Sequence, residues 1–379
     1  MNRSITTFSD SKSHYQILDG LRGVAAILVV LFHILEIFSG YDHKKQIINH
    51  GYLAVDFFFL LSGFVIGYAY DDRWSKMSIK EFFKRRLIRL HPMIILGMII
   101  GAILFYFSAS PTSFPHVAEY PIWKLMLVML VGFTLLPIPA HLDIRGWGQM
   151  HPLNGPAWSL LFEYIANILY ALFIRKFSKT VLAILVCLAG CLLIHLAVTY
   201  GDVVGGWSLR PKQIRIGLTR LIYPFFAGLL ISRVHKPGHF KNAFLWCSLL
   251  LVSILSFPRL GGGERLWLNG LYDSFSIIIL FPIIVYLGAN GKVTGDRGIK
   301  ICKFLGDISY PLYITHYPLI YIYIGWVTDH KLSILRALPV GLIVFIASLA
   351  LAYGSLKVYD MPVRNWLIKK LYTQKEKHE

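Results

Sequence analysis

Two residues of the first apolar stretch, Arg22 and His33, have side chains that could bind and activate a substrate. In a helix, residues at this spacing lie on the same face, about 16 Å apart along the axis. A guanidinium suits an anionic group, and an imidazole is the usual general base near neutral pH. The pair therefore predicts a site for an anionic donor whose reactive end reaches His33. A snorkelling arginine and a packed, hydrogen-bonded histidine would give the same pattern.

Other polar side chains interrupt later apolar stretches. Asp56 fits either a substrate ligand or a helix cap. Arg86 and Arg89 lie one helical turn apart, a spacing that suits phosphate groups. Glu163 and Asn167 are four residues apart and share a helix face. Charged groups inside spans are rarely kept without a role, so we expect these residues to line a site.

His316 is a second histidine inside an apolar stretch. It fits either a substrate contact or a ring packed between Tyr313 and Tyr317, and we favour the contact because Glu163 and His33 could accompany it. No spacing typical of a metal site is present, so no metal is predicted. The residues assigned to substrate binding are Asp56, Trp158, Ser159, Asn167, Tyr310 and His316.

The composition predicts a membrane protein. Of the 379 residues, 56% are hydrophobic and only 15% are charged, whereas soluble domains carry about a quarter charged residues. The apolar residues form long blocks with few charges, which is typical of membrane-spanning helices. The net charge of +18 comes from short Lys and Arg clusters between these blocks. Such clusters indicate cytoplasmic loops that face anionic lipid, and they argue against nucleic acid as a partner.

We predict an all-α fold with ten transmembrane helices. The block 122–136 has the length of a re-entrant or interfacial segment. If this block does not cross, most Lys and Arg residues lie on one side, whereas a crossing divides them equally. The positive-inside rule favours the first arrangement, with both termini cytoplasmic and the chain in the cytoplasmic or inner membrane. The expected spans are 17–39, 52–70, 92–107, 157–174, 180–199, 217–231, 243–257, 271–287, 304–324 and 337–356.

Residues 78–90 form a separate basic segment. Ser78 and Glu81 make a capping box, which predicts the start of a helix. Apolar and basic residues alternate after it, so we expect an amphipathic helix on the cytoplasmic surface of the membrane. The domain organisation is then a polar cytoplasmic N-terminus over 1–16, one transmembrane domain over 17–357 and a basic cytoplasmic tail over 358–379.

The sequence resembles the acyltransferase family 3 membrane proteins. Five blocks match in the family's order and cover nearly the whole chain; each is weak alone, but together they are specific. The blocks are Arg-Gly-Val-Ala-Ala…His over 22–33, Val-Asp-Phe-Phe-Phe-Leu-Leu-Ser-Gly-Phe over 55–64, Arg-Arg-Leu-Ile-Arg over 85–89, Trp-Ser-Leu-Leu-Phe-Glu over 158–163 and Ile-Ser-Tyr-Pro-Leu-Tyr-Ile-Thr-His over 308–316. One departure is Leu90-His91, where an Ile-Tyr pair is common, and it affects only local packing.

The resemblance implies an O-acyltransferase that uses acyl-CoA, with acetyl-CoA as the first expectation, and no metal. The acceptor would be a sugar hydroxyl of a polysaccharide, glycolipid or similar molecule of the cell envelope. Carried over by position, His33 is the leading catalytic residue and acts with Arg22 and Glu163. Arg86 and Arg89 correspond to the pair associated with the CoA end of the donor.

The mechanism and two other functions stay open at this stage. His33 either deprotonates the acceptor hydroxyl or carries the acyl group for a time, with Glu163 or Asp56 orienting the ring or binding the acceptor. A transporter without chemistry could use the same buried groups as a pathway, although inverted repeats are absent from the sequence. A membrane O-acyltransferase of the other large class also uses an intramembrane histidine, but lacks the opening Arg–His pair.

Overall fold

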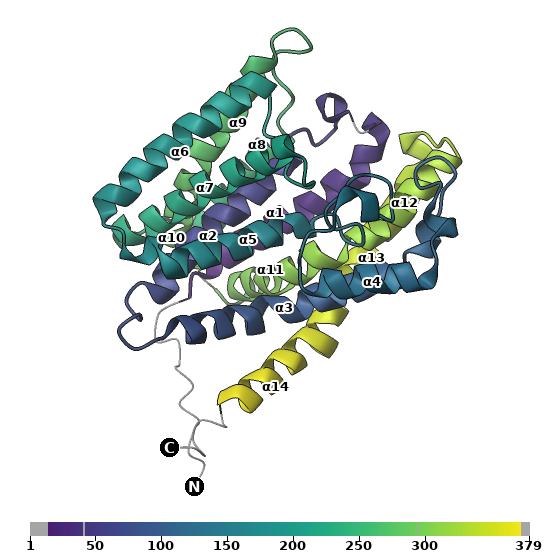
Figure 1. Ribbon diagram of the computed structural model, residues 1–379. Helices are drawn as coiled ribbons and strands as arrows, with labels where there is room; N and C mark the ends of the chain where they lie inside the picture. Colours follow the sequence, from purple (N-terminus) through teal and green to yellow (C-terminus); the bar gives the residue numbers. More distant parts are fainter. Residues whose placement is uncertain (1–13, 41, 294, 373–379) are drawn as a thin grey trace.

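A computed structural model describes residues 14–40, 42–293 and 295–372, and every regular element in these ranges is helical (Figure 1). The α-helices α9 and α10 are joined by a π-helical segment over Ser276–Leu280, and α13 and α14 by another over Ser355–Asp360. The α-helices are α1 (Gln16–Glu36), α2 (Ala54–Tyr70), α3 (Ile79–Ile103), α4 (Ile122–Phe133), α5 (Ala157–Leu172), α6 (Lys179–Tyr200), α7 (Pro211–Val234), α8 (Ala243–Ser256), α9 (Leu266–Phe275), α10 (Phe281–Ala289), α11 (Asp296–Thr315), α12 (Tyr317–Asp329), α13 (Ile334–Gly354) and α14 (Met361–Tyr372).

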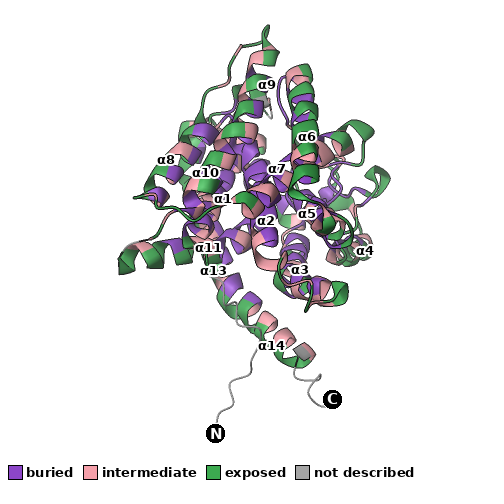
Figure 2. Cartoon of the chain, turned by 90° about the vertical axis from the view of Figure 1, so that its left-hand side faces the viewer, coloured by how far each residue is buried: buried purple, intermediate pink, exposed green. Residues whose placement is uncertain are grey.

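The burial pattern is that of a bundle in lipid. Buried residues concentrate on α1, α2 and α7, whereas α6 and α8 expose long stretches of their surface (Figure 2). The exposed face of α6 is apolar and includes Ile184, Leu188 and Leu192. Exposure of such an apolar surface to water is unfavourable, whereas its contact with lipid tails is not. The prediction of an all-α, multi-pass membrane protein is therefore confirmed.

The number of spans is less well defined than the fold class. Seven helical stretches in the described ranges are long and apolar enough to cross a membrane. Three further apolar helices, α4, α5 and α8, are shorter. The stretch expected to cross over 304–324 is divided between α11 and α12, which meet at His316. The count of ten spans and the re-entrant path of 122–136 stay predictions.

One local expectation needs correction. Residues 78–90 do not form a separate amphipathic helix, because α3 runs without a break through Pro92 to Ile103. Ser78 caps the start of α3 as expected, since its Oγ accepts a hydrogen bond from the backbone N–H of Glu81. The described part of the segment 358–379, expected as a basic cytoplasmic tail, contains α14, and its side of the membrane stays a prediction.

Glycines allow two pairs of helices to approach closely at the centre of the bundle. A Cβ atom at Gly23 of α1 would collide with the backbone of Leu305 in α11, and one at Gly306 would collide with Asp19. The same holds for α2 and α7, where Gly63 meets the backbone of Phe225. Small residues of this kind are typical of helix contacts in membranes, because the backbones gain van der Waals contact. They place α1 and α2 in the interior of the bundle (Figure 1).

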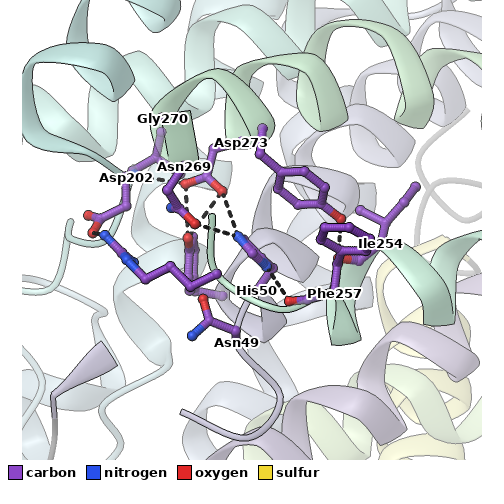
Figure 3. A network of polar contacts seen from close by, with 12 residues as sticks. Asn49, His50, Asp202, Ile254, Phe257, Asn269, Gly270 and Asp273 are labelled. Atoms are coloured by element: carbon purple, nitrogen blue, oxygen red, sulfur yellow. Dashed lines mark hydrogen bonds and ion pairs between the residues drawn. The ribbon is translucent and has the colours of Figure 1, made fainter. Parts of the chain in front are cut away.

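A buried polar network holds the chain before α2 against α9 (Figure 3). The imidazole of His50 contacts Oδ1 of Asn269 at 2.9 Å and the carbonyl oxygen of Phe257 at 2.8 Å. The carboxylate of Asp273 accepts hydrogen bonds from the Tyr52 hydroxyl at 2.9 Å and from the backbone N–H of Val203 at 3.1 Å. Each of these groups would be costly to bury alone, so the network fixes the entry to α2.

We predict that Asp273→Ala destabilises the protein. The change leaves the buried Tyr52 hydroxyl and Val203 N–H unpaired, at a cost of roughly 1–3 kcal/mol each. Thermal unfolding of the purified protein in detergent should show a clear fall in Tm, whereas Glu264→Ala at an exposed loop position should show none. An unchanged Tm for Asp273→Ala would mean that the network does not stabilise the fold.

Candidate active site

A strongly charged cavity, the basic cavity, opens at the end of the bundle where α1 begins. It has a volume of ≈ 530 Å³ and is lined by the guanidinium-bearing residues Arg22, Arg86, Arg89 and Arg364. These residues come from α1, α3 and α14, so helices far apart in the sequence contribute to one surface. A concentration of guanidinium groups is typical of sites for phosphate or carboxylate groups.

Most of the cations of the basic cavity have carboxylate partners. Arg22 Nη1 lies 3.0 Å from Asp19 Oδ1, and Arg86 Nη2 lies 2.7 Å from Glu163 Oε1. His14, just before α1, contacts Asp19 at 2.8 Å, and this hydrogen bond raises the pKa of His14. The paired carboxylates lower the cost of keeping several cations together.

Arg89 differs from its neighbours. Within the described part of the chain it has no carboxylate partner, and its side chain is exposed to the cavity. The positive charges of Arg22, Arg86 and Arg364 all repel its guanidinium. An anionic ligand beside Arg89 would offset that repulsion. Arg89 is therefore the position in the cavity where a negative charge would be stabilised most.

A second cavity, the histidine cavity, opens at the other end of α1. It has a volume of ≈ 880 Å³, and its lining includes His33, Glu36, Trp147, Trp158, Trp207 and Arg220. Aromatic rings contribute to this lining together with charged and amide side chains, which include Asp202, Lys212 and Gln213. Such a surface suits a partly apolar ligand that also forms hydrogen bonds.

His33 has a carboxylate partner on its own helix. Its Nδ1 lies 3.1 Å from Oε2 of Glu36, one turn further along α1. When the imidazole is neutral and Glu36 is ionised, Nδ1 donates this hydrogen bond and Nε2 keeps its lone pair. The pair therefore has the arrangement of a general base, in which the carboxylate orients the ring and stabilises the imidazolium that forms.

His316 packs behind His33. The two rings are stacked, with their centroids 5.5 Å apart, and His316 is completely buried. Its Nδ1 contacts the carbonyl oxygen of Leu312 at 2.9 Å, and its Nε2 is buried without a partner in the described structure. His316 lies where α11 ends and α12 begins, so the break between these helices brings the second imidazole against the first.

The two cavities meet at Val55 and Tyr313, which line both of them. The Tyr313 hydroxyl lies 2.7 Å from Ser159 Oγ, and its ring packs edge-on against Phe58. Ser159 and Phe58 line the basic cavity, whereas Trp158, the neighbour of Ser159, lines the histidine cavity. A thin layer of side chains thus separates the cations from the imidazole.

The structure divides the residues expected at the site into three groups. Arg22, Arg86, Arg89, Glu163, Ser159 and Tyr310 line the basic cavity. His33 and Trp158 line the histidine cavity. Asp56, Asn167 and His316 are buried and line neither cavity. The carboxylate beside His33 is Glu36, whereas Glu163, expected to orient the ring, is paired with Arg86.

Asp56 is the partner of a buried arginine. Arg220 of α7 donates to both of its carboxylate oxygens, with the shortest contact at 2.6 Å. The same guanidinium donates to the carbonyl oxygens of Gly205 and Tyr52. Both partners are almost completely buried. Because Asp56 belongs to α2 and Arg220 to α7, the pair joins these helices beside the histidine cavity.

Sequence reasoning missed four residues of these cavities. Glu36 could have been found, because it lies three positions after His33 and so faces the same side of a helix. Arg220 also gave a signal, since it is a charge inside an apolar stretch. Tyr313 was considered only as a packing partner, and Arg364 lies beyond the region that the sequence motifs cover.

Comparison with known proteins identifies the family of the chain. The model of a family described as "Acyltransferase domain" matches residues 15–356. The O-acetyltransferase OatA of Staphylococcus aureus is 26% identical over 319 residues, which are 80% of this chain but only 50% of OatA. The chain therefore corresponds to about half the length of that relative.

Two further relatives are matched over most of their length. The acyltransferase MdmB of Streptomyces mycarofaciens is 29% identical over 80% of this chain and 78% of its own. Protein 2 in the picA locus of Rhizobium radiobacter is 37% identical, over 41% of this chain and 80% of its own. No solved structure is significantly similar to the chain.

We predict that Arg220→Ala destabilises the protein by about 3–5 kcal/mol, because it leaves the buried Asp56 carboxylate without a partner. The double variant Asp56→Leu/Arg220→Met should recover much of this loss, since two apolar side chains replace the ion pair. Thermal unfolding in detergent measures both. A single variant as stable as the wild type, or a double variant as unstable as the single one, would contradict this role.

Proposed function

Because the chain belongs to the acyltransferase family 3, we propose that it is a membrane O-acyltransferase which moves an acyl group from acyl-CoA to a sugar hydroxyl. One observation carries this proposal more than any other. The basic cavity and the histidine cavity meet at Val55 and Tyr313, so a phosphate-binding surface adjoins a histidine–carboxylate pair. A transferase with an anionic donor needs both.

The donor would bind through its phosphates in the basic cavity. Arg22, Arg86 and Arg89 offer guanidinium groups whose planar geometry matches phosphate oxygens. On α1, Arg22 and His33 are separated by about 16 Å. The flexible pantetheine arm of the donor would bridge this distance, pass between Val55 and Tyr313 and bring the thioester to the imidazole. The name of the relative OatA as an O-acetyltransferase favours acetyl as the acyl group.

The chemistry would follow from the free lone pair of His33. Nε2 takes the proton of the acceptor hydroxyl while the hydroxyl oxygen attacks the thioester carbonyl carbon. As the C–S bond breaks, the acyl group stays on the acceptor oxygen, and the imidazolium returns the proton to the leaving CoA thiolate. Glu36 stabilises the imidazolium between these two events. The base is thereby restored without an external reagent.

The acceptor would occupy the histidine cavity. Trp147, Trp158 and Trp207 offer flat apolar faces that pack well against the C–H groups of a sugar ring. Gln149 and Gln213, also in the lining, have amide groups that can donate to and accept from sugar hydroxyls. The combination supports a carbohydrate acceptor rather than a purely apolar one.

The two cavities would face opposite sides of the membrane. His14 and Arg364 both line the basic cavity, so the beginning of α1 and part of α14 lie at the same end of the bundle. The positive-inside rule assigns this cation-rich end to the cytoplasm, where acyl-CoA is made. The histidine cavity would then receive an acceptor from the outer side of the cytoplasmic or inner membrane.

We predict that His33→Ala abolishes acylation without loss of protein. General-base catalysis contributes about 10²–10⁴-fold to such rates, so ester content should fall at least about 100-fold. Glu36→Gln should lower it by a smaller factor, because the ring keeps its place but loses the charge that stabilises the imidazolium. Mass spectrometry of cell-envelope glycans and glycolipids measures the ester in a deletion strain that carries each variant.

The chain contains a matched control for this experiment. His116 and Glu119 form the same pair at the same spacing, with Nδ1 of the histidine 3.3 Å from Oε2 of Glu119, but on an exposed segment. Glu119→Gln should leave the ester content unchanged. A well-expressed His33→Ala variant with wild-type ester content would exclude His33 as the base, and transport of a substrate without ester formation would favour a transporter.

A further inference from the structure

The structure assigns a part of the donor site to α14, a helix that lies outside the matched family domain. That domain ends at residue 356, whereas α14 covers Met361–Tyr372. We propose that Arg364 of α14 binds a phosphate group of the donor, and that Asp360 holds this guanidinium in place until the donor arrives. The inference rests on the proposed use of the basic cavity for acyl-CoA.

The position of Arg364 supports this role. Arg364 and Asp360 both line the basic cavity, together with the family's residues Arg22, Arg86 and Arg89. Arg364 is close enough to Arg89 for their charges to repel each other. Once released from Asp360, a fourth guanidinium would add to the positive charge that a ligand with several phosphates meets.

The ion pair of Arg364 suits an exchange of partners. Arg364 Nη2 lies 3.0 Å from Asp360 Oδ2, and the side chains are 29% and 3% exposed, respectively. The arginine side chain is therefore partly accessible, whereas the carboxylate is buried. Oδ1 of Asp360 is buried without a partner in the described structure. A phosphate oxygen could take the guanidinium from Asp360 without a rearrangement of the backbone.

The backbone around Arg364 is held at two points. The π-helical segment Ser355–Asp360 precedes α14 and brings Leu356 and Asp360 into the cavity wall. Such segments are rare and occur frequently at functional sites. Further along, Lys84 of α3 donates from Nζ to the carbonyl oxygen of Leu371. α14 is thus attached to the helix that also carries Arg86 and Arg89, although it projects from the lower end of the bundle in Figure 1.

Binding of CoA and of pantetheine, which lacks the phosphates, to the purified full-length protein tests the proposal by isothermal titration calorimetry. Arg364→Ala should weaken CoA binding about tenfold or more, the usual value for a charged hydrogen bond, and should leave pantetheine binding unchanged. Asp360→Asn should strengthen CoA binding, because it removes the competitor for the guanidinium. A structural role for the pair would not produce that gain.

Lys369→Ala is the matched control, since it removes a cation from the exposed face of the same helix and does not line the cavity. It should leave both affinities unchanged. Wild-type CoA affinity in Arg364→Ala, or equal weakening by Lys369→Ala, would overturn the role of Arg364 while the proposed function stands. A wild-type protein that binds no CoA would remove the proposed donor and this role together.

Discussion

The close contact between α1 and α11 is the constraint on which the site depends. At Gly23 and Gly306 the two helices lie so close that a Cβ atom would collide with the opposite helix. This contact holds α1 in the interior of the bundle. Arg22, next to Gly23, then reaches the basic cavity, and His33 reaches the histidine cavity. Because α11 ends at His316, the same contact brings the second imidazole against His33. A single helix with a fixed neighbour thus sets the distance between the basic cavity and His33.

Charge pairing explains how so many cations remain inside one membrane protein. Arg22, Arg86 and Arg364 each have a carboxylate within 3.0 Å. An unpaired charge in this environment would cost several kcal/mol, by order of magnitude. The carboxylates therefore lower the cost of holding these guanidinium groups close together. Arg220 and Asp56 differ, because their pair is nearly completely buried and serves the fold.

The fold class and the class of reaction could be predicted from the sequence alone. The contacts between helices far apart in the chain could not. Hydropathy is a property of composition, so an all-α membrane protein could be recognised without tertiary contacts. The helical spacing of Arg22 and His33 correctly placed them on one helix. The pairing of Glu163 with Arg86 and the stacking of His316 on His33 depend on contacts between helices far apart in the sequence. Periodicity within one segment carries no information about such contacts.

A cryo-EM structure of the protein with a non-hydrolysable acetyl-CoA analogue tests the two-cavity arrangement most directly. We predict phosphates at Arg22, Arg86 and Arg89, an extended arm between Val55 and Tyr313, and the acyl carbonyl beside His33 Nε2. An analogue whose phosphates occupy the histidine cavity, or whose acyl end remains on the cationic side of Tyr313, would contradict it.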